Sequence, residues 1–201
     1  MPSHFSASSN HRPTPKGAGF SLVELMVSIG IVVLVLSIVV TRQQSFNGAV
    51  LLRSQAYELA LAIREIQQSA LSAVSDGSGE FREAQGVMFR EGEDNRFRLF
   101  RDQDGNGFYS NGEDIGAPAV LDPRFEIRSI ELGLSNSDDL AVVFRRPNFD
   151  ALFFTGPNSQ NITATQAIIT IGLRGGSGTV CGEDIRQIGI KNTGQISVIE
   201  C

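Results

Sequence analysis

Residues 20–40 read FSLVELMVSIGIVVLVLSIVV, an apolar run in which Glu24 is the sole charged side chain. About 20 apolar residues in a helix suffice to cross the hydrocarbon core of a bilayer. Arg12 and Lys16 precede the run, and an excess of positive charge marks the cytoplasmic side of a membrane span. The run therefore predicts a single membrane helix with the N-terminus in the cytoplasm and everything after Val40 on the other side.

A cleaved secretory signal is the main alternative for a basic N-terminus followed by an apolar run. Such a signal carries small residues at a cleavage site after the apolar run. Here Thr41-Arg42-Gln43-Gln44 follows the run, whereas the small residues Gly17-Ala18-Gly19 come before it. This order favours a membrane helix over a secretory signal.

Glu24 lies at the fifth position of the apolar run, where an ionised carboxylate is costly in hydrocarbon. Ionised groups within a membrane usually have a partner of opposite charge. A free α-amino group at Phe20 of a neighbouring copy would neutralise Glu24, which requires cleavage of the peptide bond after Gly19. The alternative is that Glu24 lies at the depth of the lipid head groups, near the cytoplasmic face.

Residues 16–24, KGAGFSLVE, resemble the class III signal of type IV prepilins and type II secretion pseudopilins. The resemblance implies that prepilin peptidase cleaves between Gly19 and Phe20, that the new Phe20 amine is N-methylated, and that Glu24 guides each subunit into a filament. In this family the residue before the cleavage site is glycine because a larger side chain blocks the peptidase. The implied partners are other pilins or pseudopilins, the prepilin peptidase/N-methyltransferase and an inner-membrane assembly platform, with the head in the periplasm.

The remainder of the chain predicts an α+β fold, a long N-terminal helix packed on an antiparallel β-sheet head as in pilins. After Arg42, apolar residues recur mostly at three- and four-residue steps, which continues the helix as an amphipathic segment. Beyond Glu80, short strand-like runs are separated by Gly, Pro, Asn and Asp. We predict strands at Gly86–Phe89, Arg96–Phe100, Phe125–Leu132, Leu140–Arg145, Leu152–Thr155, Ala167–Leu173, Ile185–Ile190 and Gln195–Ile199.

These elements divide the chain into four predicted segments. Residues 1–19 form a basic leader that is removed, and residues 20–40 form the transmembrane and assembly helix. Residues 41–76 continue this helix as an amphipathic segment, which ends at the turn-forming residues DGSG at 76–79. Residues 80–201 form an extracytoplasmic β-rich head.

Two stretches of the predicted head, VFRRPN at 143–148 and IGIKNTGQI at 188–196, resemble the GspH/FimT branch of the same superfamily. This branch includes the minor pseudopilin H of type II secretion and the minor pilins FimT and FimU. The resemblance implies a minor subunit at or near the tip of a type II secretion pseudopilus or a type IV pilus.

The same branch suggests DNA uptake as an alternative function, through a basic C-terminal Gly-Arg-x-Arg motif. The matching stretch here is GQIS at 194–197, which lacks both arginines. The net charge is −5, and because Arg12 and Lys16 lie in the leader, residues 20–201 carry −7. An acidic head attracts nucleic acid weakly, so we expect no DNA binding.

An enzymatic function is not expected. Both histidines, His4 and His11, lie in the leader, so the processed chain has no histidine base and no histidine metal ligand. No GxSxG nucleophile elbow and no paired-carboxylate spacing stands out in the body of the sequence. We therefore predict no catalytic residue.

Two cysteines, Cys181 and Cys201, lie near the C-terminus. Their separation suits one disulfide that closes the C-terminal tail. The alternative, a zinc site, would need further ligands that histidine does not supply here. A disulfide implies an oxidising compartment.

Residues 102–113, DQDGNGFYSNGE, fit the twelve-residue calcium-loop template at every required position. Hard cations prefer several oxygen ligands at once, and an all-oxygen set of high coordination number favours calcium over magnesium. Gly107 occupies the position that requires a sharp turn. The predicted ligands are the side chains of Asp102, Asp104, Asn106, Ser110 and Glu113 and the main-chain carbonyl of Phe108.

The flanks of this loop are a predicted strand at Arg96–Phe100 and a coil at 115–118, not the two helices of an EF-hand. The alternative is therefore a hairpin tip rich in Asp, Asn and Gly that holds no ion. Similar loops occur in GspH/FimT-like heads. Both interpretations stay open on the sequence, and calcium is the one cofactor that it suggests.

Overall fold

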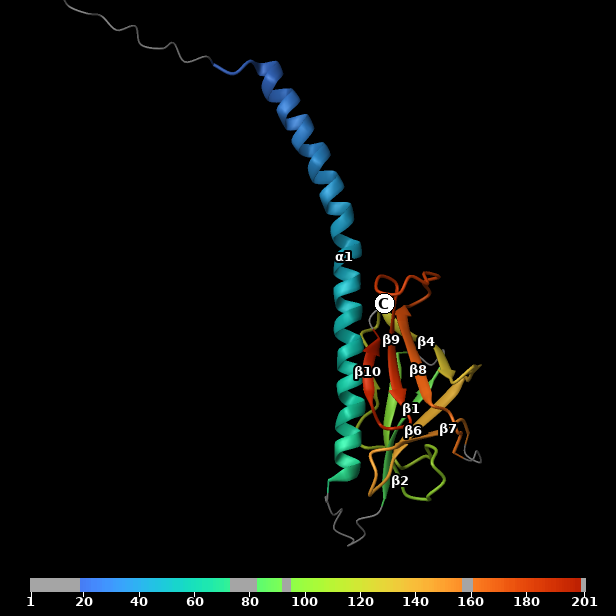
Figure 1. The fold of residues 1–201 in the computed structure, drawn as a ribbon. Helices are drawn as coiled ribbons and strands as arrows, with labels where there is room; N and C mark the ends of the chain where they lie inside the picture. The colour runs from blue at the N-terminus through green and yellow to red at the C-terminus, as the bar shows by residue number, and fades with distance from the viewer. Residues whose placement is uncertain (1–18, 73–82, 92–94, 157–160, 200–201) are drawn as a thin grey trace, which may run out of the picture. The chain divides into compact units, whose positions relative to one another are not determined.

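The computed structural model describes residues 19–72, 83–91, 95–156 and 161–199, without the side chains of residues 41–47 (Figure 1). The chain divides into two compact units, Met1–Gln43 and Gln44–Cys201, which we describe separately. Helix α1, Leu22–Leu71, contributes to both. It begins two residues after the predicted start. The predicted continuation to residue 76 extends into 73–82, which lie outside the described residues.

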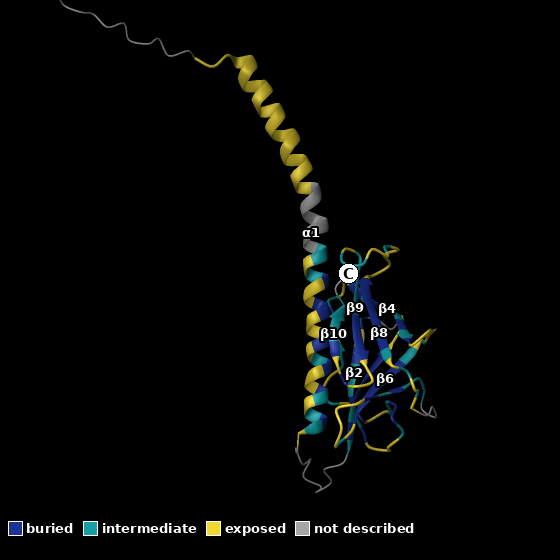
Figure 2. Cartoon of the chain, in the orientation of Figure 1, coloured by how far each residue is buried: buried dark blue, intermediate teal, exposed yellow. Residues whose placement is uncertain are grey.

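The first unit consists of the apolar part of α1. Leu22–Val40 is long and apolar enough to cross a membrane, and none of it is buried, as the exposed colouring in Figure 2 shows. The two serines of this segment satisfy their hydroxyls within the helix, since Ser28 Oγ donates to Glu24 O at 2.7 Å and Ser37 Oγ donates to Val33 O at 2.8 Å. Polar groups in hydrocarbon require such internal partners. The segment has the properties of a membrane helix.

The second unit contains two antiparallel sheets and the second half of α1. The first sheet has the order β3-β2-β1-β6-β7 and the second has the order β10-β9-β8-β4-β5. All eight predicted strands are present within a few residues of their predicted bounds. The strands are β1 Ala84–Arg90, β2 Arg96–Asp102, β3 Ala119–Val120, β4 Phe125–Leu132, β5 Ser135–Asn136, β6 Asp139–Phe144, β7 Ala151–Phe154, β8 Gln166–Leu173, β9 Ile185–Lys191 and β10 Ile196–Ile199.

Strand β4 shows how the sequence determines local structure. Phe125 and Ile127 are two positions apart, as are Ile130 and Leu132, but Ile127 and Ile130 are three positions apart. A strand alternates its faces every two residues, so this spacing would turn the second pair away from the core. The pairing with β8 shifts register between Ile127 and Ser129, and all four side chains are buried. The irregularity therefore keeps one apolar face despite the spacing.

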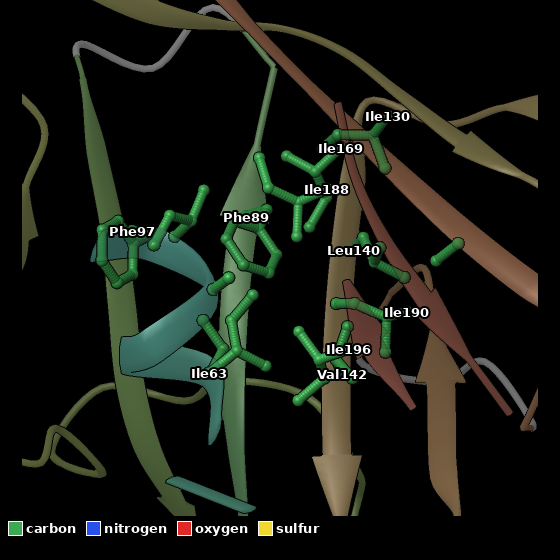
Figure 3. Packing of buried hydrophobic residues seen from close by; sticks show 14 of the residues in the cluster. Ile63, Phe89, Phe97, Ile130, Leu140, Val142, Ile169, Ile188, Ile190 and Ile196 are labelled. Carbon is green, nitrogen blue, oxygen red and sulfur yellow. The ribbon is translucent and has the colours of Figure 1, made fainter. Parts of the chain in front are cut away.

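The main core lies between α1 and the two sheets (Figure 3). One face of the helix enters it, with buried residues at steps of three and four, while Leu61 on the other face is exposed. From the first sheet the core takes side chains such as Phe89 and Val142, and from the second Ile169 and Ile188. The helical residues of the core are Leu52, Ala56, Leu59, Ala60, Ile63, Ile66 and Ala70.

A second, smaller cluster lies on the opposite face of the first sheet. It is formed by Ala84 and Met88 of β1, Phe100 of β2, Phe108 of the loop that follows β2, and Ala141 and Val143 of β6. Gly86 leaves room for the Phe100 ring, because a Cβ atom there would lie 2.8 Å from the ring. We call this the outer cluster, and it positions the loop at 102–113.

Candidate functional site

The junction predicted for cleavage is accessible. Gly19 and Phe20 precede α1, both are exposed, and a Cβ atom built on Gly19 meets no other atom within 4 Å. Phe20 is 81% exposed. A protease therefore meets no obstacle from the described part of the chain at this peptide bond.

Glu24 lies in the first turn of α1, on the exposed apolar segment. A carboxylate in the first turn interacts favourably with the helix dipole. Its carbonyl oxygen accepts the Ser28 hydroxyl, but among the described residues no basic side chain pairs with its carboxylate. The described part of the chain thus offers the Glu24 carboxylate no cationic partner.

The predicted calcium loop brings its three acids together. One carboxylate oxygen each from Asp102, Asp104 and Glu113 lies within 4.8 Å of the other two. Asp102, the last residue of β2, and Glu113 are buried, while Asp104 is exposed. The twelve-residue spacing thus brings three of the predicted ligand residues together.

Main-chain N–H groups hold two of these carboxylates in place. Gln103 N donates to Glu113 Oε1 at 2.8 Å, and Ser110 N donates to Glu113 Oε2 at 2.8 Å. Gly107 N donates to Asp102 Oδ2 at 3.1 Å. These bonds tie the end of the loop to its beginning.

The middle of the loop forms a polar network around Asp104. Asn106 N donates to Asp104 Oδ1 at 3.0 Å, and Ser110 Oγ donates to Asp104 Oδ2 at 3.1 Å. Phe108 N in turn donates to Asn106 Oδ1 at 2.6 Å. All six predicted ligand residues therefore belong to one connected loop.

Asp102 has an unusual environment for a carboxylate. Burial raises its pKa above the ordinary value, and the nearby charges of Glu113 and Asp104 raise it further, while the Gly107 N–H and Arg145 oppose the shift. Arg145 Nη2 lies 3.6 Å from Asp102 Oδ2. The other oxygen, Oδ1, is buried and has no hydrogen-bond partner among the described residues.

Arg145 is the site residue that the sequence did not suggest, because it lies 43 positions from Asp102. Asp102 pairs with Ala84 across β2 and β1, and Gln85 pairs with Phe144 across β1 and β6. Continuing this register by one residue places Arg145 beside Ala84, on the other side of β1 from Asp102. The pairing of β6 with β1 therefore brings Arg145 close to Asp102.

The loop also packs against the outer cluster through Phe108, whose side chain is buried there. Gly107 has a φ of +77°, and a Cβ atom at this position would overlap the Phe154 ring. Glycine is thus required twice at this point, for its backbone angle and for the space. The geometry of the loop and the packing of the sheet are coupled.

The remaining predicted site residues lie near the C-terminus. Cys181 is disulfide-bonded, whereas its predicted partner Cys201 lies outside the described residues, so the pairing stays a prediction. The stretch at 194–197, matched to the DNA-uptake motif, forms the turn between β9 and β10 and the start of β10.

Comparison with known proteins bears on the N-terminal segment. Residues 15–40 match the family described as the prokaryotic N-terminal methylation motif. No curated protein and no solved structure matches the chain. The matched residues include the predicted cleavage junction, Glu24 and the whole apolar run. Residues 15–40 thus carry the processing motif of type IV pilin-like proteins, attached to an α+β chain with the architecture expected of a pilin.

Proposed function

We propose that this protein is a minor pilin or pseudopilin of the GspH/FimT type, assembled through its N-terminal helix into a type II secretion pseudopilus or a type IV pilus, at or near the tip. The observation that carries the proposal is the methylation motif at 15–40, whose cleavage junction is exposed and directly precedes an apolar helix with one acid. In this role the protein acts by assembly and has no catalytic step.

The exposed apolar helix supports assembly. Every residue of Leu22–Val40 is exposed, so lipid or other helices must cover it. In the inner membrane lipid covers the helix, and in a filament the helices of neighbouring subunits replace the lipid. Glu24 would pair with the Phe20 amine of a neighbour, which supplies the cation that the described residues lack.

The two head stretches that resemble GspH/FimT proteins both contact the second half of α1. They fasten the second half of α1 to the sheets. Gln67 Nε2 donates to Gly194 O at 2.8 Å, and Arg64 Nη2 donates to Ile196 O at 2.8 Å. Arg146 Nε donates to Ala70 O at 3.2 Å. These residues would keep the head fixed on its helix while subunits pack.

The compartment follows from the same proposal. The leader lies in the cytoplasm, the span in the inner membrane and the head in the periplasm. A disulfide between Cys181 and Cys201 fits that oxidising space. The partners are other pilins or pseudopilins, the prepilin peptidase/N-methyltransferase and the inner-membrane assembly platform.

Fractionation of the host cells tests the proposal. We expect the protein in the membrane fraction and, in a smaller amount, in filaments sheared from cells that overproduce the major subunit. Deletion of the assembly ATPase of one machine should remove it from the filament fraction but leave it in the membrane. The ATPase that has this effect identifies the machine. A protein found only in the membrane, with both filaments abundant, would contradict the proposal.

A further inference from the structure

We propose that residues 102–113 bind one calcium ion on the outer side of the head. The proposal is independent of filament assembly, because it concerns a loop within the second unit. Its ligands are carboxylate, amide and carbonyl oxygens, which are the donors that hard divalent cations prefer. The structure supports the ion-binding interpretation of this loop through three observations.

The first observation is the buried, unpartnered oxygen of Asp102. The side chain of Asp102 is fully buried, and its Oδ2 atom accepts the Gly107 N–H and faces Arg145. Its Oδ1 atom is buried with no hydrogen-bond donor in the described part of the chain. A buried carboxylate oxygen without a partner is costly. An ion bound in the loop would supply the partner that Oδ1 lacks among the described residues.

The second observation is the spacing of the three carboxylates. Oxygens of Asp102, Asp104 and Glu113 lie within 4.8 Å of one another. Calcium binds oxygens at about 2.3–2.6 Å, so two oxygens on opposite sides of one ion lie up to about 5 Å apart. A single ion can therefore contact all three acids without a large movement of the loop.

The third observation is the balance of charge. Three carboxylates face one another. The cation that the structure places against them is Arg145, whose Nη2 atom lies 3.6 Å from Asp102 Oδ2 and whose side chain is half exposed. One guanidinium offsets one of three negative charges. A divalent cation would neutralise the other two, and calcium tolerates the mixed set of carboxylate, Asn106 amide and Phe108 carbonyl oxygens better than magnesium does.

Binding would have a structural consequence. Phe108 is buried in the outer cluster, and Glu113 O accepts the N–H of Arg101 at 2.8 Å, beside the last residue of β2. An ion held by Asp102 and Glu113 would fasten both ends of the loop to the sheet. Because an ion that binds the folded state stabilises it, calcium should raise the unfolding temperature of the head.

The direct test is calcium uptake by the full-length protein in detergent after removal of metal with a chelator. We expect one calcium ion per chain by equilibrium dialysis, with a dissociation constant of about 10⁻⁵ to 10⁻³ M. Asp102→Asn and Asp104→Asn should each weaken binding by at least about tenfold, since each removes one charged ligand. Asp138→Asn is the matched control, because Asp138 is an exposed acid of the same head, and it should bind as the unaltered protein does.

Terbium, a luminescent substitute for calcium, locates the ion. The chain has two tyrosines and no tryptophan, and Tyr109 lies within the loop. Terbium emission excited through tyrosine should appear on binding and should be lost in Tyr109→Phe, while calcium uptake by this variant is retained. Emission that persists in Tyr109→Phe would place the ion elsewhere and overturn the proposal.

Other results would overturn it as well. A flat titration at several millimolar calcium, or unchanged uptake in the Asp102→Asn/Asp104→Asn double variant, would show that the loop is an ion-free turn. Displacement of calcium by an equal concentration of magnesium would contradict the assignment of the metal. Because Asp104 is exposed, Asp104→Asn should fold normally and decides the test even if Asp102→Asn does not fold.

Discussion

Replacement of Glu24 by alanine is expected to leave the protein in the membrane but to reduce its incorporation into filaments by at least about 100-fold. In the proposed assembly the Glu24 carboxylate pairs with the Phe20 ammonium of a neighbouring subunit, away from water. Removal of one partner from a buried ion pair costs about 3–5 kcal/mol, because the other charge remains without compensation. Each 1.4 kcal/mol changes an equilibrium about tenfold. Insertion itself should be unaffected, since the substitution makes the span more apolar.

The measurement is the ratio of this protein in the sheared filaments to that in the membrane. Glu24→Gln should reproduce the loss, because it removes the charge and keeps the size. Ser28→Ala is the matched control, since it removes a polar group one turn away that bonds only to the Glu24 carbonyl. Normal incorporation of Glu24→Ala would show that the acid merely lies among lipid head groups, and it would rule out the assembly role.

Replacement of Gly19 by leucine is expected to abolish processing. The resemblance to prepilins implies that a larger side chain before the cleavage site blocks the peptidase. Gly19 has no neighbouring atom within 4 Å of an added Cβ, so the substitution does not disturb the described chain itself. The precursor should therefore accumulate in the membrane with its leader attached, and its mobility in a denaturing gel reports this.

Gly30→Leu provides the control, because Gly30 also has open space around it and lies within the apolar helix, beyond the cleavage site. This variant should be processed as the unaltered protein is. Unprocessed Gly19→Leu should also be absent from filaments, since the Phe20 nitrogen stays an amide and carries no charge to pair with Glu24. Complete processing of Gly19→Leu would contradict the assigned cleavage site.

Much of the fold was predictable from apolar periodicity. The helix and eight strands follow from three- and four-residue steps and from short runs between turn residues. Strands β3 and β5 were not predicted, because two-residue strands show no periodicity. Each exists through pairing, β3 with Arg96–Phe97 of β2 and β5 with Glu131–Leu132 of β4.

The division of the strands into two sheets was also not predictable. The sequence indicated an antiparallel sheet, but alternation shows which face of a strand is apolar and not which strand lies beside it. Strand β1 pairs with β6, about 50 residues away, and β4 pairs with β8. These pairings are tertiary, and they determine which side chains share each of the two apolar clusters.

The candidate sites differ in how far the sequence revealed them. The sequence pointed to the proposed cleavage junction and to Glu24 because the signal is a short contiguous motif, and residues 15–40 match the methylation motif. The spacing of the loop at 102–113 suggested an ion site, and the structure places oxygens of three of its predicted ligands within 4.8 Å of one another, while ion binding stays a proposal. The burial of Asp102 and its contact with Arg145 depend on the β1–β6 pairing, so no local pattern could indicate them.

The mass of the mature protein purified from its host membranes tests the central claim most directly. Prepilin-type processing predicts an N-terminal peptide that begins with N-methylated Phe20, with residues 1–19 absent. The same spectrum should show Glu24 unmodified within that peptide. A mature protein that retains Met1, or one cleaved after the apolar run beyond Val40, would contradict the account.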